Sequence, residues 1–170
     1  MGRIAAIVLA AGEASRFGSP KQRILLPSVL QRLGETSVDE IVVVAGAYGL
    51  ETPANVSVVD CTDWAKGPGA SLRCGVAALA DDVDAAVVVL ADGPSLSSAA
   101  VARVLDVWRR EGGIVAASYE GGRGHPLVVG RAEWRAIPDE GLRVQAVSLV
   151  PCDDLGSPGD VDTPEDAERL

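Results

Sequence analysis

The loop after the first apolar run has the residue types needed to hold a phosphate group. Small residues at Leu9-Ala10-Ala11-Gly12 would let the backbone approach a ligand, and Gly12 can adopt the positive φ that turns successive amides towards an anion. Arg16 and Lys21 could add positive charge. The glycine spacing fits neither a Walker loop nor a dinucleotide fingerprint. An ordinary strand-to-helix turn with surface cations would explain the same residues equally well.

A second glycine-containing loop runs from Trp64 to Arg73, into a helix expected to begin near Ser71. Amides at a helix start are unpaired and carry partial positive charge, so this loop could also hold phosphate, with Lys66 or Arg73 assisting. Ser71 could instead serve only as the helix cap.

Three carboxylates are the candidate metal ligands. Asp92 follows a buried apolar run, at the strand end where open α/β sheets bind ligands. Asp160 and Asp162 are one residue apart, so in an extended segment both side chains would point the same way. A few carboxylates together with substrate phosphates suit Mg²⁺. Asp92 precedes Gly93-Pro94, which is also ordinary turn chemistry.

The remaining reactive residue types are scarce. His125 is the only histidine and cannot by itself form a metal site or a catalytic triad, so the residue pattern favours a surface or hydrogen-bonding role. Cys61, Cys74 and Cys152 match no zinc or redox spacing. We therefore expect no disulfide framework, and a reducing compartment, the cytoplasm, fits best.

Composition limits the partners of the chain. Its 170 residues are 48% hydrophobic, which predicts one domain, residues 1–170, with a substantial core. A net charge of −9 argues against a general nucleic-acid or anionic-membrane surface. The longest apolar run, residues 4–11, is far shorter than the roughly 20 residues of a membrane helix. Residues 1–32 carry five basic side chains and one acidic side chain, so any polyanion must be held locally there.

The elements that must position these residues alternate between apolar runs and helical patterns. The runs are continuous, which is typical of strands covered on both faces, and predicts a three-layer α/β/α fold with a mainly parallel, Rossmann-like sheet. The expected strands are 4–9, 41–45, 56–59, 86–91, 114–117, 127–129 and 146–150, and the expected helices are 24–33, 71–79, 97–111 and 165–170.

Several of these strings resemble a known family. Leu9-Ala10-Ala11-Gly12, Arg16-Phe17-Gly18 and Lys21 are similar to the nucleotide-binding signature of the molybdenum cofactor nucleotidyltransferases, within the glycosyltransferase-A-like, nucleotide-diphospho-sugar transferase type of fold. The loop through Ser71, Asp92-Gly93-Pro94, Gly124-His125-Pro126 and the motif from Asp160 to Asp166 follow in the family's order. Leu-Ala-Ala-Gly is the form of the cytidylyltransferase branch, whereas Leu-Ala-Gly-Gly is that of the guanylyltransferase branch.

The resemblance implies a Mg²⁺-dependent transfer of CMP from CTP to the terminal phosphate of a molybdopterin-type acceptor. It implies a catalytic role for Arg16, Lys21 and Asp92, contact of His125 with the acceptor, and metal ligation by Asp92, Asp160 and Asp162. It further implies nucleotide binding by Leu9, Ala10, Ala11, Gly12, Arg16, Lys21 and Ser71.

Other functions remain open from the sequence. A GTP-dependent guanylyltransferase acting on molybdopterin or on a small phosphorylated acceptor would keep the same carboxylates, and a sugar-phosphate nucleotidyltransferase is disfavoured by the chain length. A degenerate nucleotide-binding chaperone for a molybdoenzyme would bind nucleotide without turnover. The family stretch after the lysine is shortened here to Gln22–Pro27, which could alter the acceptor pocket or cripple catalysis.

Overall fold

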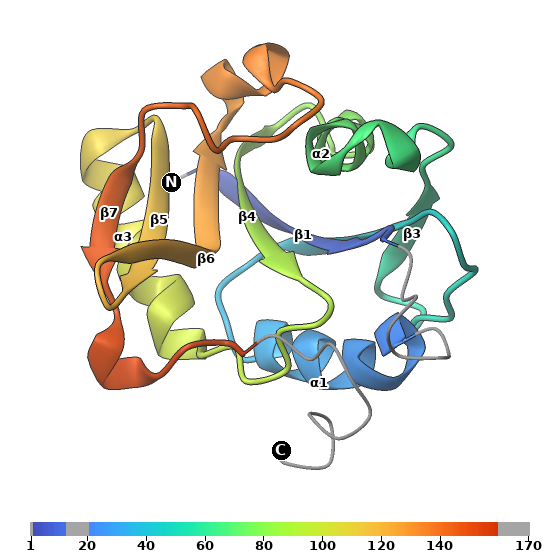
Figure 1. Ribbon diagram of the computed structural model, residues 1–170, viewed down its shortest axis with the longest axis horizontal. Helices are drawn as coiled ribbons and strands as arrows, with labels where there is room; N and C mark the ends of the chain where they lie inside the picture. The colour runs from blue at the N-terminus through green and yellow to red at the C-terminus, as the bar shows by residue number, and fades with distance from the viewer. Residues whose placement is uncertain (1, 13–20, 160–170) are drawn as a thin grey trace.

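The computed structural model describes residues 2–12 and 21–159, with Lys21 and Gln22 described by their backbone only. In this part of the chain seven strands form one sheet, in the order β3-β2-β1-β4-β6-β5-β7 (Figure 1). The strands are β1 (Arg3–Ala10), β2 (Glu40–Ala45), β3 (Ser57–Asp60), β4 (Val83–Leu90), β5 (Ile114–Tyr119), β6 (Gly122–Gly130) and β7 (Ser148–Pro151).

The sheet is mainly parallel, as the sequence predicts. β3, β2, β1 and β4 pair in parallel, and β5 pairs in parallel with β7. Only β6 is reversed among these strands, and it lies antiparallel between β4 and β5. The fold is therefore of the three-layer α/β type that the sequence predicts, with one reversed strand near its middle.

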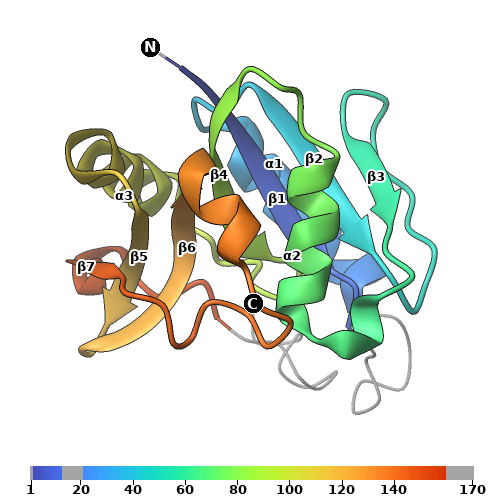
Figure 2. The same cartoon turned by 90° about the horizontal axis from the view of Figure 1, so that it is seen from above.

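Helices cover both faces of the sheet, as Figures 1 and 2 show. α1 (Lys21–Gly34) and α3 (Ser98–Glu111) contribute to one core cluster, and α2 (Pro68–Ala77) contributes to the other. Short 3-10 turns complete the described elements: η1 (Trp64–Lys66), η2 (Arg131–Ala136) and η3 (Asp153–Leu155).

The first strand explains why the apolar runs are continuous. Ala6 and Val8 of β1 pack in the α1 and α3 cluster, whereas Ala5 and Ile7 pack in the α2 cluster. Side chains of a strand alternate between its two faces, so a strand covered on both sides must be apolar at every position. This burial holds β1 and its neighbouring strands in place. It therefore also positions the edge of the sheet where the candidate site residues follow the strands.

The element boundaries differ from the sequence prediction in two informative places. β6 begins at Gly122 rather than near residue 127, because backbone pairing with β5 extends the strand through glycines and His125 that have no apolar pattern. α2 begins at Pro68 after Gly67, so Ser71 lies inside the helix and is not its cap. Proline suits a first helical position, where its missing N–H would be unpaired anyway.

The cysteines also depart from the prediction. Cys61, directly after β3, forms a disulfide with Cys74 of α2, so the expectation of three unpaired cysteines is wrong. The packing of α2 against β3 brings the Cα atoms of Cys61 and Cys74 to 5.8 Å, a normal separation for a disulfide. Spacing along the sequence cannot reveal such a contact. Cys152 remains a buried free thiol.

Two further features bear on the sequence expectations. The stretch Gln22–Pro27, which is shortened relative to the resembled family, lies in α1, a helix of 14 residues that begins at Lys21 and contains Pro27. Within residues 2–12 and 21–159, no helix combines the length and the apolar character needed to cross a bilayer.

Candidate active site

A cavity of about 390 Å³ lies where β1 and β4 end side by side. Leu9 is opposite Leu90 in the parallel register, so the loops that follow both strands leave the sheet together. Four groups of predicted site residues meet here: Leu9, Ala11 with Gly12, Ser71 and Asp92 all line this cavity. The structure thus brings the described residues that follow these two strands into one cavity, together with Ser71.

Ala10 is placed differently from its neighbours in the loop. Its side chain is 4% exposed and packs in the core cluster on the α1 and α3 face, away from the lining of the 390 Å³ cavity. Alternation along β1 directs Leu9 and Ala11 to the α2 side instead. Any contact of Ala10 with a nucleotide would have to come from its backbone.

The opposite wall of the cavity is the start of α2. Gly67 and Pro68 line it together with Trp64 of η1, and Ser71 follows one turn later with only 4% of its surface exposed. The first amides of a helix have no intrahelical acceptor and carry partial positive charge. This end of α2 therefore presents to the cavity a backbone suited to an anion.

Close backbone packing holds α2 in this position. The Gly69 N–H donates to the Asp139 carbonyl at 2.8 Å, and a Cβ on Gly69 would lie 1.6 Å from the Pro138 carbonyl oxygen. Gly67 adopts a φ of 138°, which L side chains rarely reach. Both glycines are thus required by the approach of the segment that follows η2.

The two cations expected to assist at this loop are engaged elsewhere. Arg73 donates to the Ile137 carbonyl at 2.8 Å and forms an ion pair with Asp139, so it fastens α2 to the neighbouring segment. The Arg73 hydrogen bond holds the pKa of Asp139 below its usual value. Lys66 pairs with Asp63 at 3.1 Å on the surface. Neither lines the 390 Å³ cavity.

Several predicted site residues fall outside the described part of the chain. These are Arg16, Asp160 and Asp162, together with the side chain of Lys21. Their roles stay predictions. Lys21 is the first residue of α1, and residues 13–20 separate it in the sequence from Gly12.

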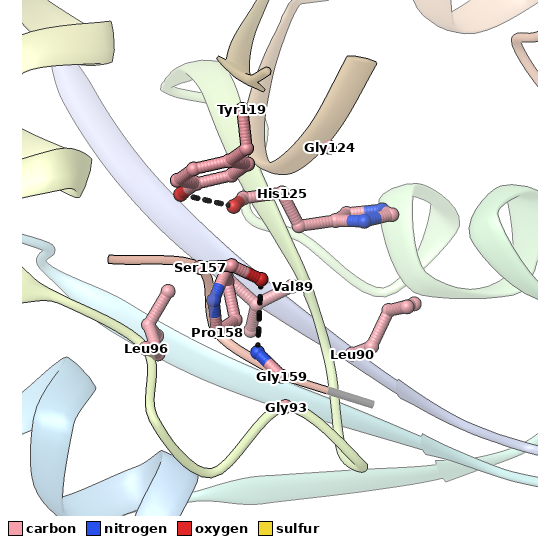
Figure 3. A pocket seen from close by; sticks show the side chains of 10 residues that line it. All are labelled: Val89, Leu90, Gly93, Leu96, Tyr119, Gly124, His125, Ser157, Pro158 and Gly159. Atoms are coloured by element: carbon pink, nitrogen blue, oxygen red, sulfur yellow. Dashed lines mark hydrogen bonds between the residues drawn. The ribbon is translucent and has the colours of Figure 1, made fainter. Parts of the chain in front are cut away.

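His125 reaches the same sheet edge because β6 is reversed. Val88 of β4 is opposite Leu127, so the first residues of β6 lie beside the end of β4 and not at the far edge. The Tyr119 hydroxyl donates to the His125 carbonyl at 2.9 Å, and Figure 3 shows the imidazole extending away from the tyrosine ring. His125 lines two cavities, of about 140 Å³ and about 520 Å³. Reasoning from the sequence missed Tyr119, whose only signal was its place at a strand end.

The His125 ring is neutral at pH 7. Its pKa is lowered to about 4, mainly by burial and also by the positive charge of Arg123, while the negative charge of Asp92 opposes the shift. The electrostatic influence of Asp92 places the predicted metal ligand and the predicted acceptor contact in one neighbourhood. A neutral imidazole can donate one hydrogen bond and accept another, which suits contact with a polar ligand.

The described residues supply one part of the expected metal site. Asp92 is the carboxylate that lines the 390 Å³ cavity, and no three His, Cys, Asp or Glu side chains within residues 2–12 and 21–159 gather as a metal site. Mg²⁺ is commonly held by one or two carboxylates together with substrate phosphates and water. One carboxylate beside an anion-binding wall fits that pattern of coordination.

Comparison with known proteins gives a consistent result. A sequence model described as the MobA-like NTP transferase domain matches residues 6–146. Among curated proteins no match reaches significance.

Solved structures resemble the chain along nearly its whole length. The crystal structure of Rv0371c from Mycobacterium tuberculosis H37Rv is 26% identical, with a TM-score of 0.82, and the match covers 99% of this chain and 97% of that one. The same protein in complex with manganese is 25% identical, with a TM-score of 0.79 and the same coverage. A 4-diphosphocytidyl-2C-methyl-D-erythritol synthase from Anaerococcus prevotii is 15% identical with a TM-score of 0.73, covers 99% of this chain and 94% of its own, and shares the fold.

Proposed function

Because the chain belongs to the family of the MobA-like NTP transferase domain, which matches 6–146, we propose that it transfers CMP from CTP to the terminal phosphate of a molybdopterin-type acceptor. Membership of this family makes the chain a nucleotidyltransferase. The observation that carries the proposal is the cavity of about 390 Å³ at the ends of β1 and β4, with Gly12, Ser71 and Asp92 in its lining.

The cavity suggests how a triphosphate would be held. Gly12 would offer its backbone from one side. The N-terminus of α2, whose Gly69 N–H already donates to Asp139, would offer the partial positive charge of the helix from the other. Arg16 and Lys21, which follow Gly12 in the sequence, would neutralise the phosphates. The protein as a whole carries a charge of −9, so this local arrangement must overcome the long-range repulsion of the nucleotide.

Asp92 supports the proposal of a Mg²⁺ cofactor, with Asp160 and Asp162 as the further ligands. These carboxylates would hold the ion, which when bound would supply the positive charge that a triphosphate and its leaving group need. The manganese complex of Rv0371c, at 25% identity, supports a divalent metal in this chain too. The proposed ligand set combines one described carboxylate with two in the segment beyond residue 159.

The chemistry asks little of protein bases. An oxygen of the acceptor phosphate attacks the α-phosphorus of CTP, a new phosphorus–oxygen bond forms, the bond to the β-phosphate oxygen breaks, and pyrophosphate leaves with the electron pair. The acceptor phosphate has a second pKa of about 6 and is already largely ionised at neutral pH. The protein therefore contributes position and charge neutralisation, and neutral His125 would orient the acceptor.

The choice of base and partner belongs to the same proposal. Ala11 lines the cavity and stands where the cytidylyltransferase branch of the resembled family has alanine, which favours CTP over GTP. A molybdoenzyme would be the recipient of the finished cofactor. We place the reaction in the cytoplasm, where nucleoside triphosphates are made, although the Cys61–Cys74 disulfide removes the cysteine pattern as support for that location.

The decisive experiment measures binding of ATP, CTP, GTP and UTP with and without Mg²⁺, followed by pyrophosphate release in the presence of molybdopterin. We expect tightest binding of CTP with Mg²⁺, and pyrophosphate release only when the acceptor is added. Preference for GTP would identify a guanylyltransferase instead. Nucleotide binding without any metal-dependent turnover would identify the chaperone and overturn the enzymatic proposal.

A further inference from the structure

A second large cavity adjoins the proposed nucleotide site on the α2 face of the sheet. It measures about 520 Å³ and lies between α2, the start of β6 and the turn at residues 140–143. Leu9, Pro68 and Leu90 line both this cavity and the one that holds Asp92. His125 lines it as well, so a molecule could touch the proposed acceptor contact and extend into this space.

Two arginines stand at this cavity over an apolar floor. Leu72, Val88 and Leu127 form part of the floor, and Arg123 and Arg143 are the basic residues of the lining. Arginine is the side chain best shaped to grip a carboxylate or phosphate through two parallel hydrogen bonds. An apolar cavity with a few convergent charged groups is the usual form of a small-molecule site.

Most of the donor capacity of these two arginines is not used by other residues in the described part of the chain. Nη1 of Arg123 donates to the Leu142 carbonyl at 2.6 Å, which fixes the side chain but uses one of its five N–H donors. Among the described residues, neither arginine takes part in an ion pair within 4.0 Å. Burial lowers the pKa of Arg123, and the positive charge of Arg143 lowers it further, so each guanidinium feels the other.

One acidic residue shares the cavity without cancelling this charge. Glu140 is part of the lining, but none of the ion pairs in the described part of the chain joins it to Arg123 or Arg143. Two like charges facing one space repel each other, and an anion between them would remove that repulsion. The lining keeps a net positive charge in a protein whose overall charge is −9.

From this geometry we propose that the 520 Å³ cavity is a subsite for a second anionic group of the phosphorylated acceptor, held by Arg123 and Arg143. The inference rests on the proposed function for the identity of the acceptor, although the subsite itself can be tested without nucleotide. The acceptor would then carry, besides its phosphomonoester, a second anionic group, for which a carboxylate serves as the probe in the test below. His125 lines the same cavity, so an acceptor held there would also contact its side chain.

The test uses a series of ω-phosphooxy carboxylates with two, three and four carbons, each paired with its neutral amide of the same shape. Binding is measured by calorimetry to the full-length protein, with and without CTP and Mg²⁺. We expect at least one carboxylate to bind about tenfold more tightly than its amide, the size expected for a charge-assisted bidentate contact. Arg143→Gln should abolish this preference, because it removes one of the two positive charges proposed to hold the carboxylate. The variant should still fold, since Arg143 is exposed and its loss leaves the core intact.

Arg110→Gln is the matched control, because it removes the same charge from an exposed site at the end of α3. It should keep the preference for the carboxylate. An equal preference in the wild type and Arg143→Gln, or no preference at any chain length, would overturn the subsite. Failure of the wild type to bind any nucleotide would instead refute the proposed function, while the comparison without nucleotide would still decide the subsite.

Discussion

The two halves of the sheet contribute to the candidate site in different ways. In the parallel half, β1 and β4 supply small side chains, backbone and the single carboxylate Asp92 to a cavity closed by the start of α2. In the half that contains the reversed strand β6, larger polar side chains line the neighbouring cavities: His125, Tyr119 and Arg123. The parallel half is therefore suited to a phosphate chain, which backbone amides can hold. The half with β6 is suited to a ligand that is recognised by specific side chains.

The largest effect on activity is expected from a substitution of Asp92, in the parallel half. We expect Asp92→Ala to lower pyrophosphate release by about 10³-fold, the size typical of removing one charge-stabilising group from a transition state. The fold should survive, since the residue lines an open cavity. The measurements are steady-state pyrophosphate release and the thermal midpoint.

Asp84→Ala is the control for Asp92, because Asp84 is an exposed aspartate near the start of β4, the strand that Asp92 follows. It should retain full turnover. Normal activity in Asp92→Ala would show that the metal and nucleotide are held elsewhere, and the functional contrast between the halves would fail.

Gly69 tests how firmly the two halves are joined. A Cβ at this position would lie 1.6 Å from the Pro138 carbonyl oxygen, so Gly69→Ala must push α2 away from the segment after η2. We expect a loss of about 3 kcal/mol in the free energy of unfolding, a size typical of overpacking against rigid backbone. Urea denaturation measures this loss. Gly34→Ala, where the added Cβ would meet nothing within 4 Å, should change stability little.

His125 should make the β6 half sensitive to acid. Its pKa is about 4 in the folded protein, below the ordinary value of 6.5, so the unfolded chain binds more protons between these two values. The stabilisation is complete above pH 6.5 and is lost as the pH falls towards 4. Because the ring is partly exposed, we expect a loss of about 2 kcal/mol between pH 7 and pH 4.5.

The measurement is urea unfolding in EDTA at several pH values, compared with His125→Gln. The variant should lack this part of the acid dependence, while carboxylates whose pKa is lowered, such as Asp139, act in both proteins. Identical acid dependence in the two proteins would mean that the imidazole titrates at its ordinary value.

The smallest effect is expected at Ala11, in the parallel half. Ala11→Gly removes a methyl group from the cavity lining and should shift the ratio of CTP to GTP binding about fivefold towards GTP, roughly 1 kcal/mol. Titration of both nucleotides in the presence of Mg²⁺ measures the ratio, with ATP as an internal control. An unchanged ratio would separate base choice from this position.

Much of the parallel half is predictable from local chemistry. Strands buried on both faces must be continuously apolar, so β1 and β2 are found within one residue at each end. α3 is equally clear, because Ser97 precedes its apolar face and its hydroxyl accepts the Ala100 N–H at 3.3 Å. Both features are determined by residues that are close in the sequence, so they can be predicted without knowledge of the tertiary structure.

The β6 half is harder to predict because its strands are set by tertiary pairing. The first residues of β6 are glycines, Arg123 and His125, and only their pairing with β5 makes them a strand. The reversal of β6 is also invisible in its composition, yet it decides that His125 reaches the edge near Asp92. For the same reason the sequence placed Asp92 and Gly12 together but offered no signal for the arginine pair.

The Cys61–Cys74 disulfide has a consequence for the wall of the nucleotide cavity. With a sequence separation of 13 it closes a covalent ring, and Trp64, Gly67 and Ser71 lie on that ring. A ring of this size restricts the unfolded chain by about 3 kcal/mol. A dithiol reductant would therefore act on one half of the molecule only. It would open the ring beside the nucleotide cavity, whereas the buried thiol of Cys152 would stay chemically unchanged.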